Sequence, residues 1–275
     1  MATPIGNLGD MSVRAMETLR NVDVIACEDT RESGKLTSAY GIEADKMPYH
    51  DHNAAEMRPK ITGMIRDGMR VALISDAGMP LISDPGYKLV ESCIAEDLFV
   101  TCIPGATASL TALVLSGLPS DRFMFAGFLP PKSSARRSAL AEVRAVPGTL
   151  IFYETAPRLA ESLADMLDIL GDRPAAVSRE LTKKFEETRR GLLSELTAHY
   201  AEAGGPKGEI VVVVGAPPAD AAEQWTDETI DAALKRMMED EGMSVKDAAA
   251  FVAAKSGLKK SGVYQRAILL QNKKR

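Results

Sequence analysis

Three segments rich in glycine, proline and small polar residues could hold a ligand against their backbone. They are TPIGNLGD (residues 3–10), SDAGMPLISDPG (75–86) and PGATAS (104–109). Glycine lets the backbone approach a ligand closely, proline fixes the loop shape in advance, and small residues at a helix start leave N–H groups free for an acceptor. Each segment alone could be a structural turn. Three of them at one predicted sheet edge favour a ligand-binding site.

Standard nucleotide and metal signatures are absent from the sequence. It has neither G-x-G-x-x-G nor G-x-x-x-x-G-K-[ST], so no common motif indicates NAD or ATP. Its three histidines form no H-E-x-x-H, and Cys27, Cys93 and Cys102 lack metal-ligand spacing, so we expect no metal site. Each cysteine lies in or beside an apolar run, which is typical of a buried free thiol in a reducing cytoplasm.

The composition is that of a soluble globular protein, with 45% hydrophobic and 26% charged residues among 275. No apolar run approaches the ~20 residues that cross a bilayer. No basic segment followed by an apolar one marks a secretory leader, so we expect a cytoplasmic protein without a membrane partner. The net charge is −5, yet residues 255–275 hold seven Lys or Arg and no acid. This basic end either attracts a polyanion or is a solvated terminus.

The elements that must position the three loops alternate between strands and helices. Continuous apolar runs predict strands at 22–27, 70–75 and 98–104, which suits a parallel sheet covered on both faces. Amphipathic patterns predict helices at 12–20, 30–40, 54–67 and 85–96, the first capped by Ser12. This alternation predicts an open α/β domain, which we place at 1–117.

A second α/β domain is predicted at 118–220. Its expected strands are 122–129, 149–155, 175–180, 185–191 and 208–216, and its expected helices are 134–145, 157–170 and 193–203. No crossover helix fits between the third and fourth strands, so they should pair antiparallel in a mixed sheet. Residues 216–224 suit a linker. A helical domain at 226–275 should contain helices at 227–241, 244–256 and 259–270.

Long motifs along the chain resemble one known family. They include ATPIGNLGD, ACEDTRESGKL, SDAGMPLISDPG, IPGATA, FYETAPRL, SRELTKKFEE and GEIVVVVGA. Together they resemble the small-subunit ribosomal RNA cytidine 2′-O-methyltransferases of the tetrapyrrole methylase superfamily. The resemblance implies a two-domain class III S-adenosylmethionine methyltransferase fold, a donor site in the cleft between the domains, and a homodimer. It also implies a full strand before ATPIGNLGD, where this sequence supplies only Met1 and Ala2.

The resemblance also implies which residues contact S-adenosylmethionine. Asp76 is the expected carboxylate partner of the donor, and Tyr153 is expected in the adenosine pocket. The remaining implied contacts lie in the three loops, at Pro4, Ile5, Gly78, Pro80, Leu81, Ile82, Ser83, Gly105, Ala106, Thr107 and Ala108.

Methylation of a ribose hydroxyl requires orientation of the acceptor and loss of a proton, to which a general base would contribute. Polar residues at predicted strand ends are the catalytic candidates: Asn7, Glu28, Asp29, Arg31 and Glu154. Which of them acts as the base stays open. Glu–Arg pairs in loops are also common as plain ion pairs, and Glu180 fits such a structural role.

Basic residues near the predicted cleft and in the last helices are candidates for binding RNA. They are Lys132, Arg136, Arg137, Arg158, Arg179, Lys183, Lys259, Lys260 and Arg266. The last three belong to a pair of helices that resembles a helix-turn-helix. Small-subunit ribosomal RNA is the expected partner. The alternatives are a methyltransferase of the same fold for a tetrapyrrole or another small acceptor, and a non-catalytic nucleic-acid-binding protein.

Overall fold

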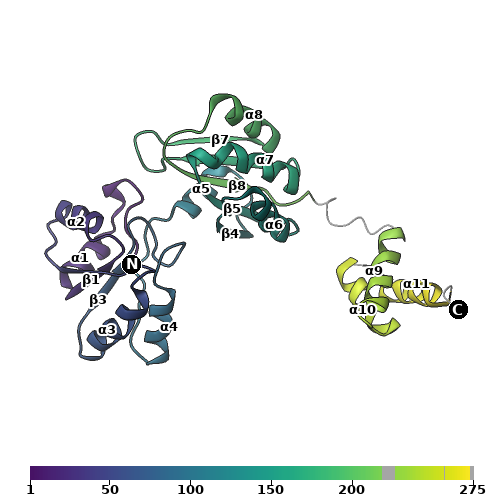
Figure 1. Cartoon of the computed structure of the whole chain (residues 1–275), viewed down its shortest axis with the longest axis horizontal. Helices are drawn as coiled ribbons and strands as arrows, with labels where there is room; N and C mark the ends of the chain where they lie inside the picture. Colours follow the sequence, from purple (N-terminus) through teal and green to yellow (C-terminus); the bar gives the residue numbers. More distant parts are fainter. Residues whose placement is uncertain (219–226, 257, 273–275) are drawn as a thin grey trace. The chain divides into compact units, whose positions relative to one another are not determined.

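The computed structural model describes residues 1–218, 227–256 and 258–272 of the chain. Its contacts group Met1–Ala216 into one compact unit and Pro217–Arg275 into another. The first unit contains two separate β-sheets, and the described part of the second contains three helices (Figure 1). Most of the predicted linker (219–224) and the basic residues 273–275 lie outside the described residues, as do the predicted domain boundaries at 220 and 226.

The first sheet is parallel, in the order β2 (Asp45–Pro48), β1 (Val24–Cys27), β3 (Val71–Ile74). It confirms two predicted strands and the predicted parallel pairing. The strand β2 was not predicted, because only one of its four residues is buried and its sequence has no apolar run.

Four helices accompany this sheet, close to their predicted positions: α1 (Val13–Asn21), α2 (Thr30–Ala39), α3 (Ala54–Arg66) and α4 (Tyr87–Ala95). The hydroxyl of Ser12 accepts a hydrogen bond from Ala15 N at 3.1 Å and caps α1 as predicted.

The predicted strand at 98–104 is wrong, since this segment pairs with no strand. Between it and β3 lies an apolar groove of about 880 Å³, lined by residues of both. Met1 N donates to Leu73 O at 2.7 Å and Ala2 N donates to Ile103 O at 3.0 Å. Met1 and Ala2 therefore link β3 to the segment 98–104 through one hydrogen bond to each. A strand forms only where a neighbour completes its hydrogen bonds, which an apolar sequence alone cannot guarantee.

The second sheet is mixed and has the order β4–β5–β8–β6–β7. Its strands are β4 (Phe123–Phe128), β5 (Thr149–Thr155), β6 (Pro174–Arg179), β7 (Glu187–Leu192) and β8 (Glu209–Val214). The strands β4 and β5 are parallel, whereas β6 pairs antiparallel with β7 as predicted. All five strands confirm predicted ones.

The central strand β8 is covered on both faces, and it is accordingly apolar and buried at every position after its first. Val212 and Val214 pack in a core with α6 (Ser133–Val143), α7 (Leu159–Leu170) and α8 (Leu193–Ala203). The alternate residues Val211 and Val213 pack with α5 (Ala108–Ser116) and with Ile5 from the first loop. The first loop thus reaches the second sheet.

The C-terminal unit has its own small core between α9 (Asp227–Glu239), α10 (Val245–Ser256) and α11 (Lys260–Asn272). Ser244 caps α10 by accepting a hydrogen bond from Asp247 N at 3.2 Å. None of the helices in the described ranges is long and apolar enough to cross a membrane.

Candidate active site

A cavity of about 410 Å³ lies where the predicted loops meet the second sheet. Seven of the residues expected to contact the donor line it: Ile5, Gly78, Ile82, Ser83, Thr107, Ala108 and Tyr153. The other walls come from the ends of β4, β5 and β8 and from Leu181. Residues far apart in the sequence therefore meet at one cavity of a size usual for small-molecule sites.

Backbone hydrogen bonds hold the first loop beside the second. Thr3 N donates to Gly78 O at 2.9 Å, and Gly78 N donates back to Thr3 O at 3.2 Å. A side chain on Gly78 would place its Cβ 3.2 Å from Ile5 Cγ2 and 3.6 Å from Ala106 O, and its φ of +81° is unfavourable for any L residue. Glycine at this position lets all three loops converge.

The second loop has an unusual backbone between β3 and α4. The non-glycine residues Leu81 and Ser83 have φ values of 72° and 66°, and Gly86 has a φ of 131°. A Cβ on Gly86 would come within 2.6 Å of Leu73. Left-handed non-glycine residues cost of order 1–3 kcal/mol each and gather at functional sites. The loop therefore keeps a fixed, costly shape at the cavity.

Aromatic rings form one wall of the cavity. Tyr153 meets Phe125 and Phe128 edge to face, with ring centroids 4.7 Å and 5.4 Å away. Burial raises the pKa of the Tyr153 hydroxyl, and hydrogen bonding to Ser109 opposes this shift. Phe128 is more than half exposed, so its ring remains available to a flat ligand.

Six residues expected at the donor do not line this cavity. Pro80 and Leu81 instead line the groove beside β3. Pro4 is buried, and Gly105 lies against Ala2. Asp76 is exposed and accepts a hydrogen bond from Asp29 N at 3.1 Å, directly before the lining residues Ala77 and Gly78. Ala106 contributes the carbonyl that faces Gly78.

The candidate base Glu154 lies in the cavity wall, but its side chain is 0% exposed. It accepts hydrogen bonds from Thr155 N at 2.7 Å and from the Ser162 hydroxyl, and it pairs with Arg158 Nε at 3.2 Å. Arg158 also donates to Leu129 O. The Glu154 carboxylate is thus fully engaged within the protein, with Arg158 as an ion-pair partner, and its catalytic role stays a prediction.

The candidates Asn7, Glu28, Asp29 and Arg31 lie outside the cavity lining. Asn7 accepts from Gly9 N at 2.9 Å, as a cap of the short 3₁₀ helix Leu8–Asp10. Asp29 caps α2 and pairs with Arg31 at 2.7 Å. Hydrogen bonding to Arg31 lowers the pKa of Asp29 to about 2, so this carboxylate is a weak base. Burial and then the nearby Asp76 raise the pKa of Glu28.

Asp84 is a cavity residue that the sequence analysis missed. It belongs to the second loop, where the expectation fell on the residues before it. Burial, followed by the negative charge of Glu28, raises the pKa of Asp84 to about 6. The repeated Ser-Asp pair in SDAGMPLISDPG was the signal that could have pointed to it.

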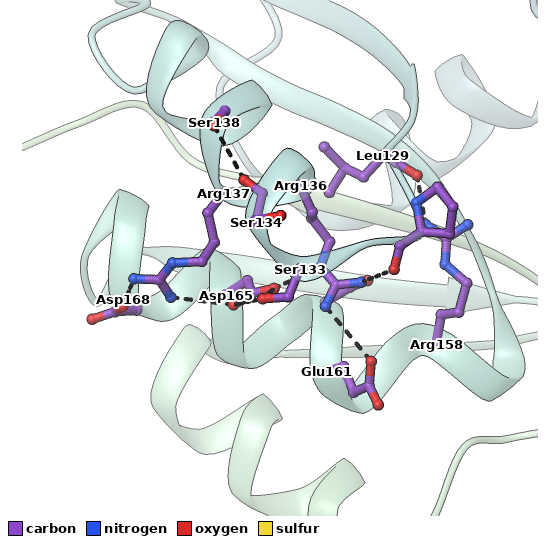
Figure 2. A network of polar contacts seen from close by, with 12 residues as sticks. Leu129, Ser133, Ser134, Arg136, Arg137, Ser138, Arg158, Glu161, Asp165 and Asp168 are labelled. Carbon is purple, nitrogen blue, oxygen red and sulfur yellow. Dashed lines mark hydrogen bonds and ion pairs between the residues drawn. The ribbon is translucent and has the colours of Figure 1, made fainter.

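Arg136 is not available to RNA, which corrects that prediction. Its side chain is 1% exposed, and its Nε donates to Asp165 at 2.7 Å. Figure 2 shows it between Asp165 and Glu161 of α7, together with Ser133 at the start of α6. Arg137 pairs with Asp165 at 3.2 Å and with Asp168. The two arginines after β4 therefore lie on a helix, as predicted for 134–145, and fasten it to α7.

Other basic candidates also have acidic partners. Arg179 pairs with Glu187 at 2.8 Å across β6 and β7. Lys183 pairs with Glu180 at 3.0 Å and with Glu209 at 2.9 Å, consistent with the structural role expected of Glu180.

In the C-terminal unit, Arg266 pairs with Asp227 and Asp231 of α9. Lys132, Lys259 and Lys260 are exposed. Over the described ranges, no three His, Cys, Asp or Glu side chains are grouped so as to hold a metal ion.

Comparison with known proteins places this site in a family. The description "Tetrapyrrole (Corrin/Porphyrin) Methylases" matches residues 2–197, and "RsmI C-terminal HTH domain" matches residues 223–271. A protein of Mesorhizobium japonicum named ribosomal RNA small subunit methyltransferase I is 50% identical over 99% of this chain and 91% of its own length. A protein of the same name from Erythrobacter litoralis is 52% identical over 98% of this chain and 94% of its own length.

A solved structure of diphthine synthase has the same fold, with a TM-score of 0.61, 15% sequence identity, and coverage of 77% of this chain and 87% of that one. The matched descriptions, the identity over nearly the whole length and the loop-lined cavity lead to one assignment. This chain belongs to the tetrapyrrole methylase family and, within it, to the proteins named ribosomal RNA small subunit methyltransferase I.

Proposed function

We propose that this protein transfers a methyl group from S-adenosylmethionine to the 2′-hydroxyl of a cytidine in small-subunit ribosomal RNA. The observation that carries the proposal is the cavity where the three loops meet the aromatic wall of the second sheet. The names of the relatives and the match to a ribosomal RNA methyltransferase C-terminal domain support the substrate class.

The residues present fit the methyl donor. Its adenine ring would lie against apolar and aromatic side chains such as Ile82 and Phe128. Backbone carbonyls brought together by Gly78 would face its cationic sulfonium and α-amino groups, with Asp76 as the carboxylate at the rim. When bound, the donor supplies an electrophilic methyl group. The protein's own contribution is to orient the acceptor in line with that group and to exclude water.

RNA recognition is assigned to the C-terminal unit and to exposed lysines. Lys259 and Lys260 lie at the start of α11, in a helix pair that matches a helix-turn-helix description. Phosphate contacts by such lysines would position the RNA without reading its bases. A small-molecule acceptor such as a tetrapyrrole has no use for this unit, so RNA is favoured over the alternative within the same fold.

The deciding experiment is methyl transfer from labelled S-adenosylmethionine to small ribosomal subunits isolated from cells that lack this modification. We expect one methyl group per subunit, on a cytidine ribose. If the folded protein binds the donor by calorimetry but labels no RNA, the substrate assignment is wrong. If it binds RNA but no donor, the enzymatic assignment is wrong as well.

The Asp76 assignment has a separate test by calorimetry without RNA. Replacing Asp76 by Ala should weaken donor binding about tenfold, since a charged hydrogen bond contributes ~1.5–3 kcal/mol. Unchanged affinity would remove Asp76 from the donor site.

We further propose a cytoplasmic homodimer. The exposed apolar residues Leu110 and Val114 on α5, and Phe123 and Met124 on the edge strand β4, support a self-association surface. Light scattering after size-exclusion chromatography should give twice the 29.5 kDa chain mass. Val114→Glu should reduce it to one chain, and an unchanged dimer would place the interface elsewhere.

A further inference from the structure

The cavity contains one carboxylate that the proposed function has not yet used. Within the described ranges, four titratable side chains line it: Asp84, Tyr153, Glu154 and Glu209. Glu154 is fully engaged by its neighbours, and Glu209 pairs with Lys183 at 2.9 Å. The Tyr153 hydroxyl interacts with Ser109 and, unlike a carboxylate, is protonated at neutral pH.

Asp84 differs from these groups in its surroundings. Within the part of the chain that the structure describes, no cation pairs with it, and the buried Ser75 is the hydroxyl that interacts with it. Its charged neighbours are acids, namely Glu28 after β1 and Asp76 after β3. The carboxylate therefore keeps hydrogen-bond capacity for a ligand.

The backbone fixes Asp84 at this position. It lies between Ser83, which has a left-handed φ of 66°, and Gly86, whose carbonyl accepts the first hydrogen bonds of α4 from Leu89 and Val90. On its other side the loop approaches β4, where a Cβ on Gly127 would come 3.5 Å from Ser83 Oγ. A strained loop anchored at both ends holds a side chain more precisely than a free one.

The acid–base properties match the position. Burial and the charges of Glu28 and Asp76 raise the pKa of Asp84 to about 6, while the Ser75 hydroxyl opposes that shift. Tyr153 also lines the cavity, close enough for its charge to interact with that of Asp84, and its hydroxyl is protonated at neutral pH. A base with such a pKa is largely ionised at neutral pH, yet binds a proton far better than an ordinary aspartate.

We propose that Asp84 is the general base that takes the proton from the acceptor hydroxyl, an inference that rests on the proposed methyl transfer. The hydroxyl oxygen forms a bond to the methyl carbon while the methyl–sulfur bond breaks, and the electron pair of that bond goes to sulfur. The hydroxyl proton goes to an Asp84 carboxylate oxygen and then to solvent. Of the carboxylates lining the cavity, Asp84 is the one to which the described residues offer no cation or backbone donor that it would have to give up before it can act.

The test compares Asp84→Asn with the wild type and with Asp121→Asn, an exposed control outside the cavity. Single-turnover methylation by Asp84→Asn should fall by ~10²- to 10⁴-fold, and donor affinity measured by calorimetry without RNA should stay within about threefold. The wild-type rate should fall as pH drops below about 6, and the variant should lose this dependence.

A measurement independent of activity is the pH titration of aspartate carboxyl groups by ¹³C NMR. The signal that Asp84→Asn removes should titrate well above the usual aspartate range. Asp84→Asn activity within threefold of an active wild type, a tenfold loss of donor affinity, or titration of Asp84 near 4 would each overturn the proposal. An inactive wild type would instead overturn the proposed function, and the base with it.

Discussion

The buried ion pair between Arg136 and Asp165 gives a quantitative test of how α6 is fastened to α7 (Figure 2). Arg136→Met keeps the apolar volume and removes the guanidinium. Asp165, 11% exposed at its side chain, would lose its 2.7 Å partner and keep Ser133 at 3.0 Å and Arg137 at 3.2 Å. Breaking a buried pair costs ~3–5 kcal/mol, and the two remaining donors place this case near ~3 kcal/mol.

The assay is urea unfolding followed by circular dichroism, on the full chain. The matched control is Arg66→Met, because Arg66 is 60% and its partner Glu96 is 35% exposed, and such surface pairs contribute under ~1 kcal/mol. The double variant Arg136→Met with Asp165→Leu should recover most of the loss, since apolar replacements of a whole buried pair are close to neutral.

The pH dependence adds a second check. Burial alone would raise the pKa of Asp165, but hydrogen bonds from Arg136, Ser133 and Arg137 outweigh it and hold that pKa below its usual value. A depressed folded-state pKa stabilises the protein above the unfolded-state pKa, and this contribution is lost as pH falls through the folded value. Arg136→Met should reduce that acid sensitivity. A loss under ~1 kcal/mol, or weaker RNA binding at unchanged stability, would refute the structural role.

Three further predictions concern other parts of the chain. Asp84→Asn should stabilise the protein relative to the wild type at pH 7 but not at pH 4. In the wild type the folded-state pKa of Asp84 is about 6 instead of 3.8, so the folded protein loses stability as pH rises between these values, and asparagine cannot ionise. This pKa shift corresponds to a change in the free energy of unfolding of ~3 kcal/mol at most, and of about 1 kcal/mol after solvent screening of the half-buried side chain. The pH dependence of Tm in the two proteins measures it. Lys259→Glu with Lys260→Glu should weaken RNA binding in a filter assay and reduce its salt dependence, with donor affinity unchanged; equal RNA affinity would exclude these lysines. Four β-branched residues added before Met1 should enter the groove beside β3 and raise the free energy of unfolding by about 2 kcal/mol, whereas four Ser or Gly residues should not.

Local sequence determined much of the scaffold. TLIFYET predicts β5 at Thr149–Thr155, and the helix at Leu193–Ala203 is found where its amphipathic pattern places it. The three Gly- and Pro-rich loops were recognisable because their residue types respond to purely local demands, such as the positive φ of Gly78 and Gly86. The two-domain methyltransferase fold was inferred from long motifs shared with a known family.

Tertiary structure decided what each polar side chain does. Glu154 and Arg136 have the residue types of a base and a phosphate ligand, yet both are buried and paired, Glu154 with Arg158 just after its strand and Arg136 with Asp165 of another helix. The segment 98–104 has the apolar pattern of a strand but forms none, because a strand depends on hydrogen bonds to a neighbour. Asp84 acquires its raised pKa only in the folded chain, through its burial and through the negative charges of Glu28, which follows β1, and of Asp76 in its own loop. Sequence order specifies residue types and local backbone preferences, whereas burial and electrostatic environment are set by residues that only the folded chain brings together.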